Sequence, residues 1–328
     1  MTKFKYNLQL FAGELNTNLT SSEGLTKEMK TYYSDYLIDN AIPKLVHDQF
    51  GQKHPIPKNG GKTIEFRKYS PLPKLTTPIS EGVTPDGQSL NMSTIEATVA
   101  QYGGYITLSD VLLLTAIDNN LVQATKLLGA QAGSTLDTIT REVLNGGTNV
   151  IFSGGKSARS DLDATSVLTV DDIKKAVRLL KNQNAEPING SWVGIIHPDI
   201  AYDLTNDPAW KDVKTYSDPS DIYEGEIGKI YGVRFVETTE AKVWAKGGSG
   251  GQAVYSTLIL GDNAYGVTEI SGGGLEHIVK QLGSAGTGDP LNQRATAGWK
   301  ATKVAERLVE NYMVRIESCS TFNDANAN

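Results

Sequence analysis

Two glycine-rich stretches contain residue types that could act on phosphate or acyl groups. Gly155-Lys156-Ser157 is similar to the end of a phosphate-binding loop, but the upstream position that needs glycine is Val150, and no strand–loop–helix pattern surrounds it. Ser249 lies in a Gly-x-Ser-x-Gly pattern at 247–251, where a nucleophilic serine needs a helix to follow. Because a strand is expected after this stretch, it predicts a flexible loop between strands.

Histidine and carboxylate patterns give no support to a metal site. The histidines are not at ligand spacing from one another, and His197, between an apolar run and Pro198, is typical of a structural histidine. An acidic run lacks the alternate-residue spacing of a calcium loop, so it predicts a solvated face; its members are Asp199, Asp203, Asp207, Asp212, Asp218, Asp221, Glu224 and Glu226. We therefore assign no catalytic, cofactor-binding or metal residue, and we do not expect an enzyme.

Composition indicates a soluble globular protein with room for more than one domain. The chain has 328 residues, of which 39% are hydrophobic and 21% charged. Its longest apolar runs, such as 111–114 and 258–260, are too short to cross a bilayer, and no signal-peptide core follows the basic start. Cys319 is the only cysteine, so no intrachain disulfide is possible. We expect a cytoplasmic product.

The charge balance argues against a dedicated nucleic-acid binder. The formal net charge is −6, and the lysines and arginines form no basic run along the chain. The four tryptophans, at positions 192, 210, 244 and 299, are expected to pack in cores or interfaces.

A long hairpin is the most unusual element that the sequence predicts. Residues 63–69 alternate as a strand does, and residues 95–102 form a second alternating run, with Gly103-Gly104 allowing a bend before 105–108. About 25 polar, proline-rich residues join the strands, where compact domains use two to five. Since an isolated two-stranded ribbon is marginal in water, the hairpin either folds back on its own subunit or lies across a neighbour.

One long helix follows the hairpin. Ser109 and Asp110 supply cap chemistry, and Asn145-Gly146-Gly147 supplies the stop. A single apolar stripe recurs at steps of three and four: Leu114, Ile117, Leu121, Ala124, Leu128, Ala132, Leu136, Ile139 and Val143. The spacing favours a helix of roughly 45 Å lying on a sheet over a coiled coil. Gly129 and Gly133 either bend it or pack it tightly.

The remaining segments predict an arm, a short helix and an α/β unit. Residues 1–25 are polar and mixed, and a helix begins at Thr26. In the second half, Thr169 caps a helix that carries Ile173, Val177 and Leu180, and a short helix begins after His197. Strands are expected at 192–196, 233–236, 254–260, 264–268, 298–304 and 312–317, before a polar tail at 320–328.

Three short runs resemble one family of proteins. Tyr6-Asn7-Leu8-Gln9-Leu10-Phe11-Ala12 is similar to the start of many major capsid proteins of tailed bacteriophages. Residues 292–300, from Asn292 to Lys300, and 313–317, from Met313 to Glu317, are similar to the end of one subgroup. The order of arm, hairpin, long helix and α/β domain matches as well, so the resemblance covers essentially the whole chain.

This resemblance implies an α+β protein with the tailed-phage major capsid fold. Its parts would be an N-terminal arm and short helix at 1–59, an extended hairpin loop at 60–108, a peripheral domain with the spine helix at 109–164, an α/β axial domain at 165–290, and C-terminal strands completing the peripheral domain, with a tail, at 291–328. Some relatives crosslink a hairpin lysine to a neighbour's asparagine; Lys62, Lys68 and Lys74 lie in that region, but the sequence identifies neither partner nor catalytic acid.

The implied function is a shell subunit that forms hexamers and pentamers of an icosahedral head around double-stranded DNA. Its partners would be copies of itself, a separate scaffolding protein and a portal, with DNA enclosed without sequence-specific binding, no membrane contact and no cofactor. It would be made in the host bacterial cytoplasm and end in the virion capsid. Two alternatives remain open at this point: an encapsulin-like nanocompartment shell around protein cargo, and a soluble α/β hydrolase or ligand-binding protein.

Overall fold

The computed structural model describes residues 17–19, 46–79, 81–82, 84, 86–115, 120–210, 228–269, 274–284, 288–323 and 327. The chain divides into two compact units, each built from three segments. The first unit contains residues 1–45, 101–137 and 273–302, and the second contains 46–100, 138–272 and 303–328. Apart from residues 17–19, the expected arm and the helix expected from Thr26 lie outside the described residues.

A seven-stranded mixed sheet forms the centre of the second unit. Its strand order is β6-β15-β11-β7-β9-β8, with β10 beside β11. β7 (Trp192–Ile196) and β11 (Val254–Leu260) are buried along their whole length, as their continuous apolar runs predict for central strands. The others are β6 (Val150–Phe152), β8 (Lys229–Ile230), β9 (Val233–Glu237), β10 (Val243–Trp244) and β15 (Met313–Ser318).

Two helices of this unit begin where the sequence predicts. Thr169 caps α4 (Val170–Asn182) by accepting a hydrogen bond from the Asp172 amide at 3.3 Å. α5 (Pro198–Asn206) begins with its proline in the first turn, after His197. Ile173, Val177 and Leu180 of α4 join the buried core against the sheet. Short 3₁₀ turns lie at η3 (Ser153–Gly155), η4 (Arg159–Asp161), η6 (Ser249–Gly251) and η8 (Glu310–Tyr312).

The first unit combines long strands with most of the long helix. β5 (Ala100–Ser109) lies next to β14 (Arg294–Arg307), β1 (Thr17–Leu19) pairs with β5 in parallel, and β13 (Glu276–Lys280) pairs with β14 in antiparallel orientation. The Trp299 indole donates a hydrogen bond to the Gln131 side chain at 3.0 Å, which fastens the sheet to the helix.

The bend predicted at Gly103-Gly104 is wrong. β5 runs through both glycines, and the interruption lies instead at Val99, between β4 (Met92–Thr98) and β5. A Cβ on Gly103 would lie 2.7 Å from the Trp299 carbonyl oxygen. Glycine is therefore needed here because two strands approach closely, and not because the chain turns.

The long helix is described as two segments, α2 (Asp110–Thr115) and α3 (Asn120–Asn145). The Asp110 side chain accepts a hydrogen bond from the adjacent Val111 amide at 2.7 Å, whereas an N-cap side chain accepts from an amide two or three residues further on. The buried Ser109 hydroxyl has no hydrogen-bond partner among the described residues, so the predicted cap is not formed. Ala124, Leu128, Ala132 and Leu136 of the predicted stripe are buried. Gly129 and Gly133 are buried inside α3 as well, which favours tight packing over a bend.

Arginines satisfy the carbonyl groups at the end of α3, in the second unit. Arg307 donates to the Val143 carbonyl oxygen at 2.6 Å, and Arg315 donates to that of Asn145. Helix ends leave such carbonyls without backbone donors and carry partial negative charge, so two cations stabilise this terminus.

The two C-terminal strands belong to different sheets. Residues 304–307 of β14 pair with β12 (Tyr265–Thr268), which pairs in parallel with β2 (Gln52–Lys53). β15 instead pairs with β11 and β6 in the seven-stranded sheet. Because β15 is buried along most of its length, it needs neighbours on both edges, and β11 and β6 provide them.

In the part of the chain that the structure describes, no helix has the length and apolar character to cross a membrane.

Candidate interaction surface

The hairpin forms a two-stranded ribbon, which we define as β3 (Thr63–Tyr69) with β4. The strands are antiparallel, with Thr63 opposite Thr98 and Tyr69 opposite Met92. Two further backbone hydrogen bonds extend the ladder, from Val99 to Lys62 at 2.8 Å and from Ser70 to Asn91 at 2.9 Å. Among the described residues no third strand joins this sheet, so both its outer edges are unpaired. The predicted strand at 63–69 is confirmed.

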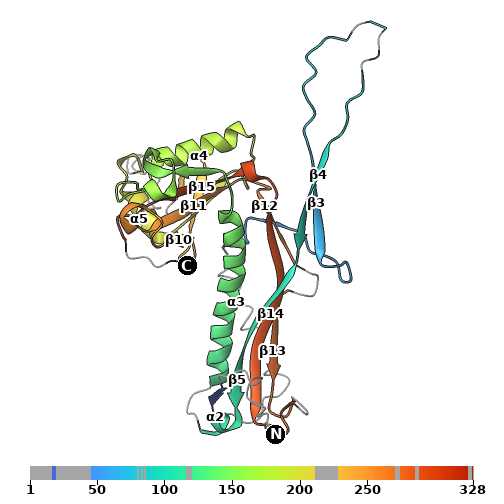
Figure 1. Cartoon of the computed structure of the whole chain (residues 1–328), viewed down its shortest axis with the longest axis vertical. Helices are drawn as coiled ribbons and strands as arrows, with labels where there is room; N and C mark the ends of the chain where they lie inside the picture. The colour runs from blue at the N-terminus through green and yellow to red at the C-terminus, as the bar shows by residue number, and fades with distance from the viewer. Residues whose placement is uncertain are drawn as a thin grey trace, which may run out of the picture. The chain divides into compact units, whose positions relative to one another are not determined.

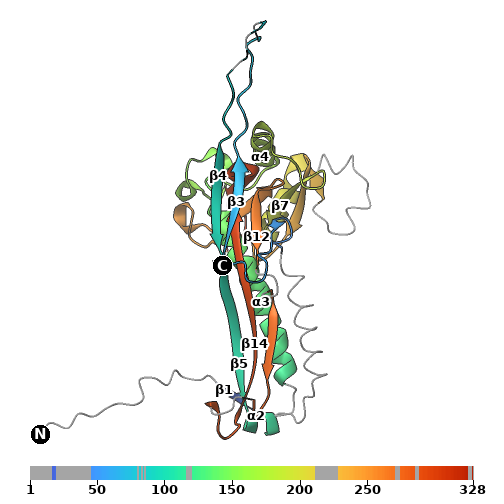
Figure 2. The same cartoon turned by 90° about the vertical axis from the view of Figure 1, so that its right-hand side faces the viewer.

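The ribbon continues into an extended loop, residues 71–90, which we call the ribbon tip. Its described residues form neither helix nor strand, and Figures 1 and 2 show the two chain segments running outward beyond β3 and β4. Prolines at 71, 73 and 78 remove backbone donors there and prevent the ladder from continuing.

Large apolar side chains of the ribbon tip, and of the last residue pair of the ribbon, Tyr69 and Met92, are exposed to solvent. Leu75, Ile79 and Leu90 expose 71–77% of their surface, and Tyr69, Leu72 and Met92 expose 48–61%. A monomeric soluble protein exposes single apolar residues, whereas this group is concentrated on one element with almost no neighbours of its own. Such a surface is typical of a segment that is covered by a partner.

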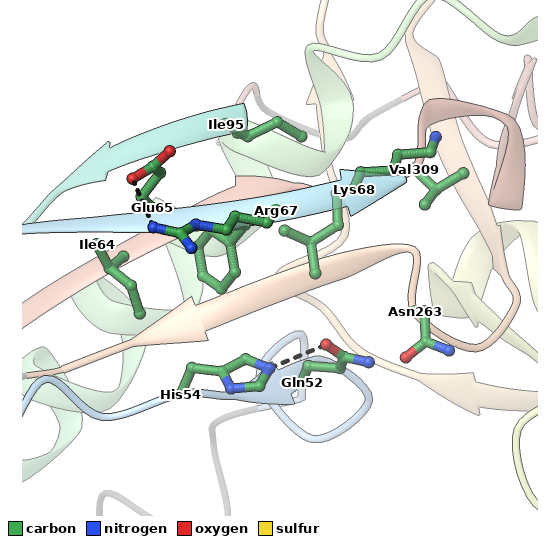
Figure 3. Close-up of a pocket in the computed structure, with 11 residues that line it drawn as sticks. Gln52, His54, Ile64, Glu65, Arg67, Lys68, Ile95, Asn263 and Val309 are labelled. Carbon is green, nitrogen blue, oxygen red and sulfur yellow. Dashed lines mark hydrogen bonds and ion pairs between the residues drawn. The ribbon is translucent and has the colours of Figure 1, made fainter. Parts of the chain in front are cut away.

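The base of the ribbon packs on its own chain. The ring of Phe66 lies against Gly266 of β12 and meets the His54 ring edge-on at a centroid distance of 5.6 Å. A pocket of about 490 Å³ opens beside this contact (Figure 3), lined by Gln52, His54, Ile64, Glu65, Phe66, Arg67, Lys68, Ile95, Asn263, Leu308 and Val309. The base of the ribbon is thus packed on its own subunit, whereas the apolar side chains of its tip are exposed to solvent.

Charges on the ribbon are exposed. Glu65 lies directly opposite Glu96, and two like charges in this arrangement destabilise a strand pair. The Arg67 guanidinium lies 3.7 Å from the Glu65 carboxylate and partly offsets this repulsion. Lys62, Lys68 and Lys74 are all exposed, and Lys68 lines the pocket of Figure 3 together with Asn263.

The residues with possible catalytic chemistry have structural roles in the second unit. Lys156 forms an ion pair with Asp163 at 2.7 Å, which lowers the pKa of that carboxyl well below its usual range. The His197 ring accepts a hydrogen bond from the Asp199 amide at 3.2 Å and so caps α5, and burial lowers the pKa of His197. Among the described residues, no three histidine, cysteine or carboxylate side chains gather as metal ligands would.

The glycine-rich stretch 247–251 forms a short 3₁₀ turn, η6, in the connection that the sequence predicts between strands. The Ser249 amide donates to the Leu162 carbonyl oxygen at 2.7 Å, and a Cβ on Gly248 would come 2.6 Å from the same oxygen. Its glycines allow close backbone packing and, at Gly250, a positive φ of 68°. As expected, a strand, β11, follows it.

The acidic run is not a uniformly solvated face, which corrects that expectation. Asp203 is buried and accepts hydrogen bonds from the Ser320 hydroxyl at 2.7 Å and the Thr321 amide at 2.9 Å. Asp199 accepts one from the Tyr255 hydroxyl at 2.8 Å. The two bonds to Asp203 also fasten the start of the C-terminal tail. The members at 212, 218, 221, 224 and 226 lie outside the described residues.

Comparison with known proteins points in one direction. A family model described as "Phage capsid protein" matches residues 113–279, about half of the chain. No curated protein sequence is significantly similar to the chain.

Among solved structures, the capsid of Ralstonia phage GP4 has a TM-score of 0.67 at 14% identity, covering 85% of this chain and 90% of that one. The capsid structure of Cyanophage P-SCSP1u has a TM-score of 0.64 at 13% identity, covering 84% and 88%. The capsid asymmetric unit of Cyanophage Pam1 has a TM-score of 0.65 at 14% identity, covering 97% and 100%. At such identities the likeness establishes the fold, which is the predicted one.

Proposed function

Because this chain belongs to the family of phage capsid proteins, we propose that it is the major capsid protein of a tailed phage, which assembles into the hexamers and pentamers of an icosahedral head around double-stranded DNA. The observation that carries this proposal is the ribbon, anchored by Phe66 at its base and bare over its tip. A free monomer gains nothing from holding Leu75 and Ile79 in water, whereas a shell subunit buries them on the next copy.

The parts of the chain take the roles that the fold implies. Residues 60–108 are the extended loop that reaches a neighbouring subunit, and 109–164 are the peripheral domain with its spine helix. Residues 165–290 are the axial domain at the centre of each ring. From 291 onward, β14 contributes to the peripheral domain, while β15 extends the sheet of β7 and β11.

Assembly then follows from geometry and multiplicity. Each ribbon presents two unpaired strand edges, which are templates for further strand pairing and are a liability until covered. In a ring the ribbon of every subunit binds one neighbour, and the subunit itself is bound by the ribbon of another. Because the ring is closed, no subunit can leave unless several of these contacts break at once. Modest contacts therefore hold a stable shell, and no catalytic group is required.

The remaining partners are proposals from the same reasoning. A separate scaffolding protein and a portal would direct assembly, and DNA would be enclosed without sequence-specific contacts. Synthesis would take place in the host bacterial cytoplasm, and the mature location is the virion capsid.

An encapsulin-like compartment is the second candidate, since a shell fold alone does not decide between DNA and protein cargo. Particles of that kind would be small and contain protein, whereas phage heads would be larger and package DNA. A soluble hydrolase or ligand-binding protein would stay a monomer or small oligomer, and removing the ribbon tip would not change its oligomeric state.

The proposal is tested by making the tip polar without changing its backbone. We design a variant with Leu72→Ser, Leu75→Ser, Ile79→Ser and Leu90→Ser, and a control with Leu72→Ile, Leu75→Ile, Ile79→Leu and Leu90→Ile, which keeps the apolar area. Circular dichroism should be unchanged in both, because these side chains are exposed in the single chain. Light scattering and electron microscopy should show closed shells only with the control. Equal assembly of both variants would contradict a role of the tip.

A further inference from the structure

The exposed side of α4 carries a stripe of positive charge that the sequence does not reveal as a run. Lys174, Arg178 and Lys181 are spaced by four and three residues, so they lie on one helix face, and all three are exposed. In the second unit α4 lies beside the seven-stranded sheet (Figure 1). Its apolar residues Ile173, Val177 and Leu180 are buried in the core. The stripe therefore points to the outside of the unit.

The nearby carboxylates of α4 do not cancel this stripe. Asp171 and Asp172 are both bound by Lys175, at 2.9 Å and 3.1 Å. Among the described residues, none of the three stripe cations forms an ion pair within 4.0 Å; the Asp171 pKa is lowered mainly by Lys175, with Lys174 a smaller cause. On a chain with a net charge of −6, this is a local concentration of the opposite sign.

Aromatic rings lie under two of the cations. The Lys174 Nζ is 4.7 Å from the ring centroid of Tyr231, and the Lys181 Nζ is 5.4 Å from that of Trp192. Cation–π contacts at these distances hold an ammonium group in place while leaving its donors free for a ligand. Tyr231 itself is 48% exposed, so its ring and hydroxyl are also accessible.

Tyr231 occupies a strained backbone position. It has a φ of 48° and is followed by Gly232 with a φ of 83°, in the two-residue turn that joins β8 to β9. Such turns favour Asn-Gly, and a bulky residue in the left-handed region costs about 1–2 kcal/mol. An exposed tyrosine in this strained position, with its ring beside Lys174, indicates that the ring has a use beyond forming the turn.

We propose that Lys174, Arg178, Lys181 and Tyr231 form a binding surface for the phosphate backbone of double-stranded DNA. This inference rests on the proposed function. It requires that the face of α4 with the cationic stripe is turned toward the lumen of the shell. Seven residues of helix span about 10 Å, which matches the axial rise of about three base pairs. Phosphate contacts carry no sequence information, so any packaged DNA suffices. The negative charge of the remaining surface keeps this binding weak enough for DNA to leave.

The test measures binding of a short fluorescent DNA duplex to unassembled subunits over a range of salt concentrations. The stripe variant is Lys174→Gln, Arg178→Gln and Lys181→Gln; the matched control is Lys53→Gln, Lys246→Gln and Lys280→Gln, which removes the same charge from other exposed sites. The stripe variant should bind at least about tenfold more weakly, with a salt slope smaller by roughly 2 to 3. The control should bind like the original chain.

A third variant separates binding from folding. Tyr231→Asn keeps a residue that tolerates the left-handed turn, so the chain should become slightly more stable while the duplex binds less tightly. Closed empty shells should not bind duplex added outside, because the stripe is inside.

Several outcomes would overturn the inference while leaving shell assembly intact. One is an equal loss of duplex binding in the stripe and control variants. Another is binding of external duplex by closed shells. A third is tighter binding of poly-glutamate than of DNA, which would indicate an acidic protein as the partner of the stripe. Failure of the original chain to form shells would instead count against the proposed function.

Discussion

Phe66 of the ribbon lies on Gly266 of β12: a Cβ on Gly266 would come 3.3 Å from Cζ of Phe66 and 3.4 Å from Cδ1 of Leu308. The absence of a side chain at residue 266 thus creates the seat in which the ribbon base rests. This contact joins the element that we propose clasps a neighbour to the body of its own subunit.

Gly266→Val should displace Phe66 and destabilise the second unit. Overpacking of this kind costs about 1–3 kcal/mol, which urea denaturation of unassembled subunits would measure. Gly288→Val is the matched control, since a Cβ there meets nothing within 4 Å. Equal stability of the two variants would show that the ribbon base is not seated on β12.

Arg159→Leu should destabilise the subunit clearly. Arg159 donates two hydrogen bonds of 2.7 Å to Glu317, which is completely buried, and stacks 3.6 Å above the Trp244 ring. Removing it leaves Glu317 with Arg315 alone, and we expect a loss of about 2–3 kcal/mol in unfolding free energy. The control is Lys156→Leu, which breaks an equally short pair whose carboxylate, Asp163, is partly exposed where Glu317 is buried, and which should change stability little. Similar effects of the two substitutions would contradict this assignment.

Stability of unassembled subunits should fall as the pH drops below about 6.5. Burial lowers the pKa of His197 in the folded chain, with Asp199 opposing the shift, so over this range the unfolded chain binds a proton that the folded chain does not. The stability that neutral His197 contributes is therefore fully present above its ordinary pKa and is lost as the pH falls from there through the lowered pKa of the folded chain. His197→Asn keeps an N-cap side chain but should flatten this part of the curve, as urea unfolding at several pH values would show. An unchanged slope would exclude His197 as its source.

Cys319 should react slowly with thiol reagents in the folded chain. It is the only cysteine, it is completely buried, and burial raises its pKa to about 11. Labelling by iodoacetamide should become fast only after urea unfolding, because the thiolate is the reactive form. Rapid labelling of native subunits would show that this part of the second unit opens readily.

Local pattern predicted the elements well and their partners poorly. The apolar runs at 192–196 and 254–260 became β7 and β11 with the expected bounds, and Thr169 caps α4 as predicted. The pairing of β15 with β11 and β6 could not be predicted, because pairing depends on contacts between residues far apart in sequence. For the same reason Gly103 suggested a bend, although its purpose is close approach to Trp299.

The interaction surface was only half predictable. Alternation at 63–69 predicted the ribbon, yet the pattern could not say whether its loop is covered by its own subunit, which the exposure of Leu75 and Ile79 now answers. The cationic stripe had a readable signal in the helical spacing of Lys174, Arg178 and Lys181. These residues are not consecutive, so they form no basic run in the sequence. The strained turn at Tyr231 lacks the Asn-Gly pair that would predict it.

The central claim is that the ribbon tip is buried by another copy of the chain. The most direct measurement is a cryo-electron microscopy map of particles formed by the purified chain, alone or co-expressed with a scaffolding protein. We predict closed icosahedral shells in which residues 71–90 lie on the adjacent subunit. A monomer or small oligomer in solution, with those residues packed on their own subunit, would contradict the account.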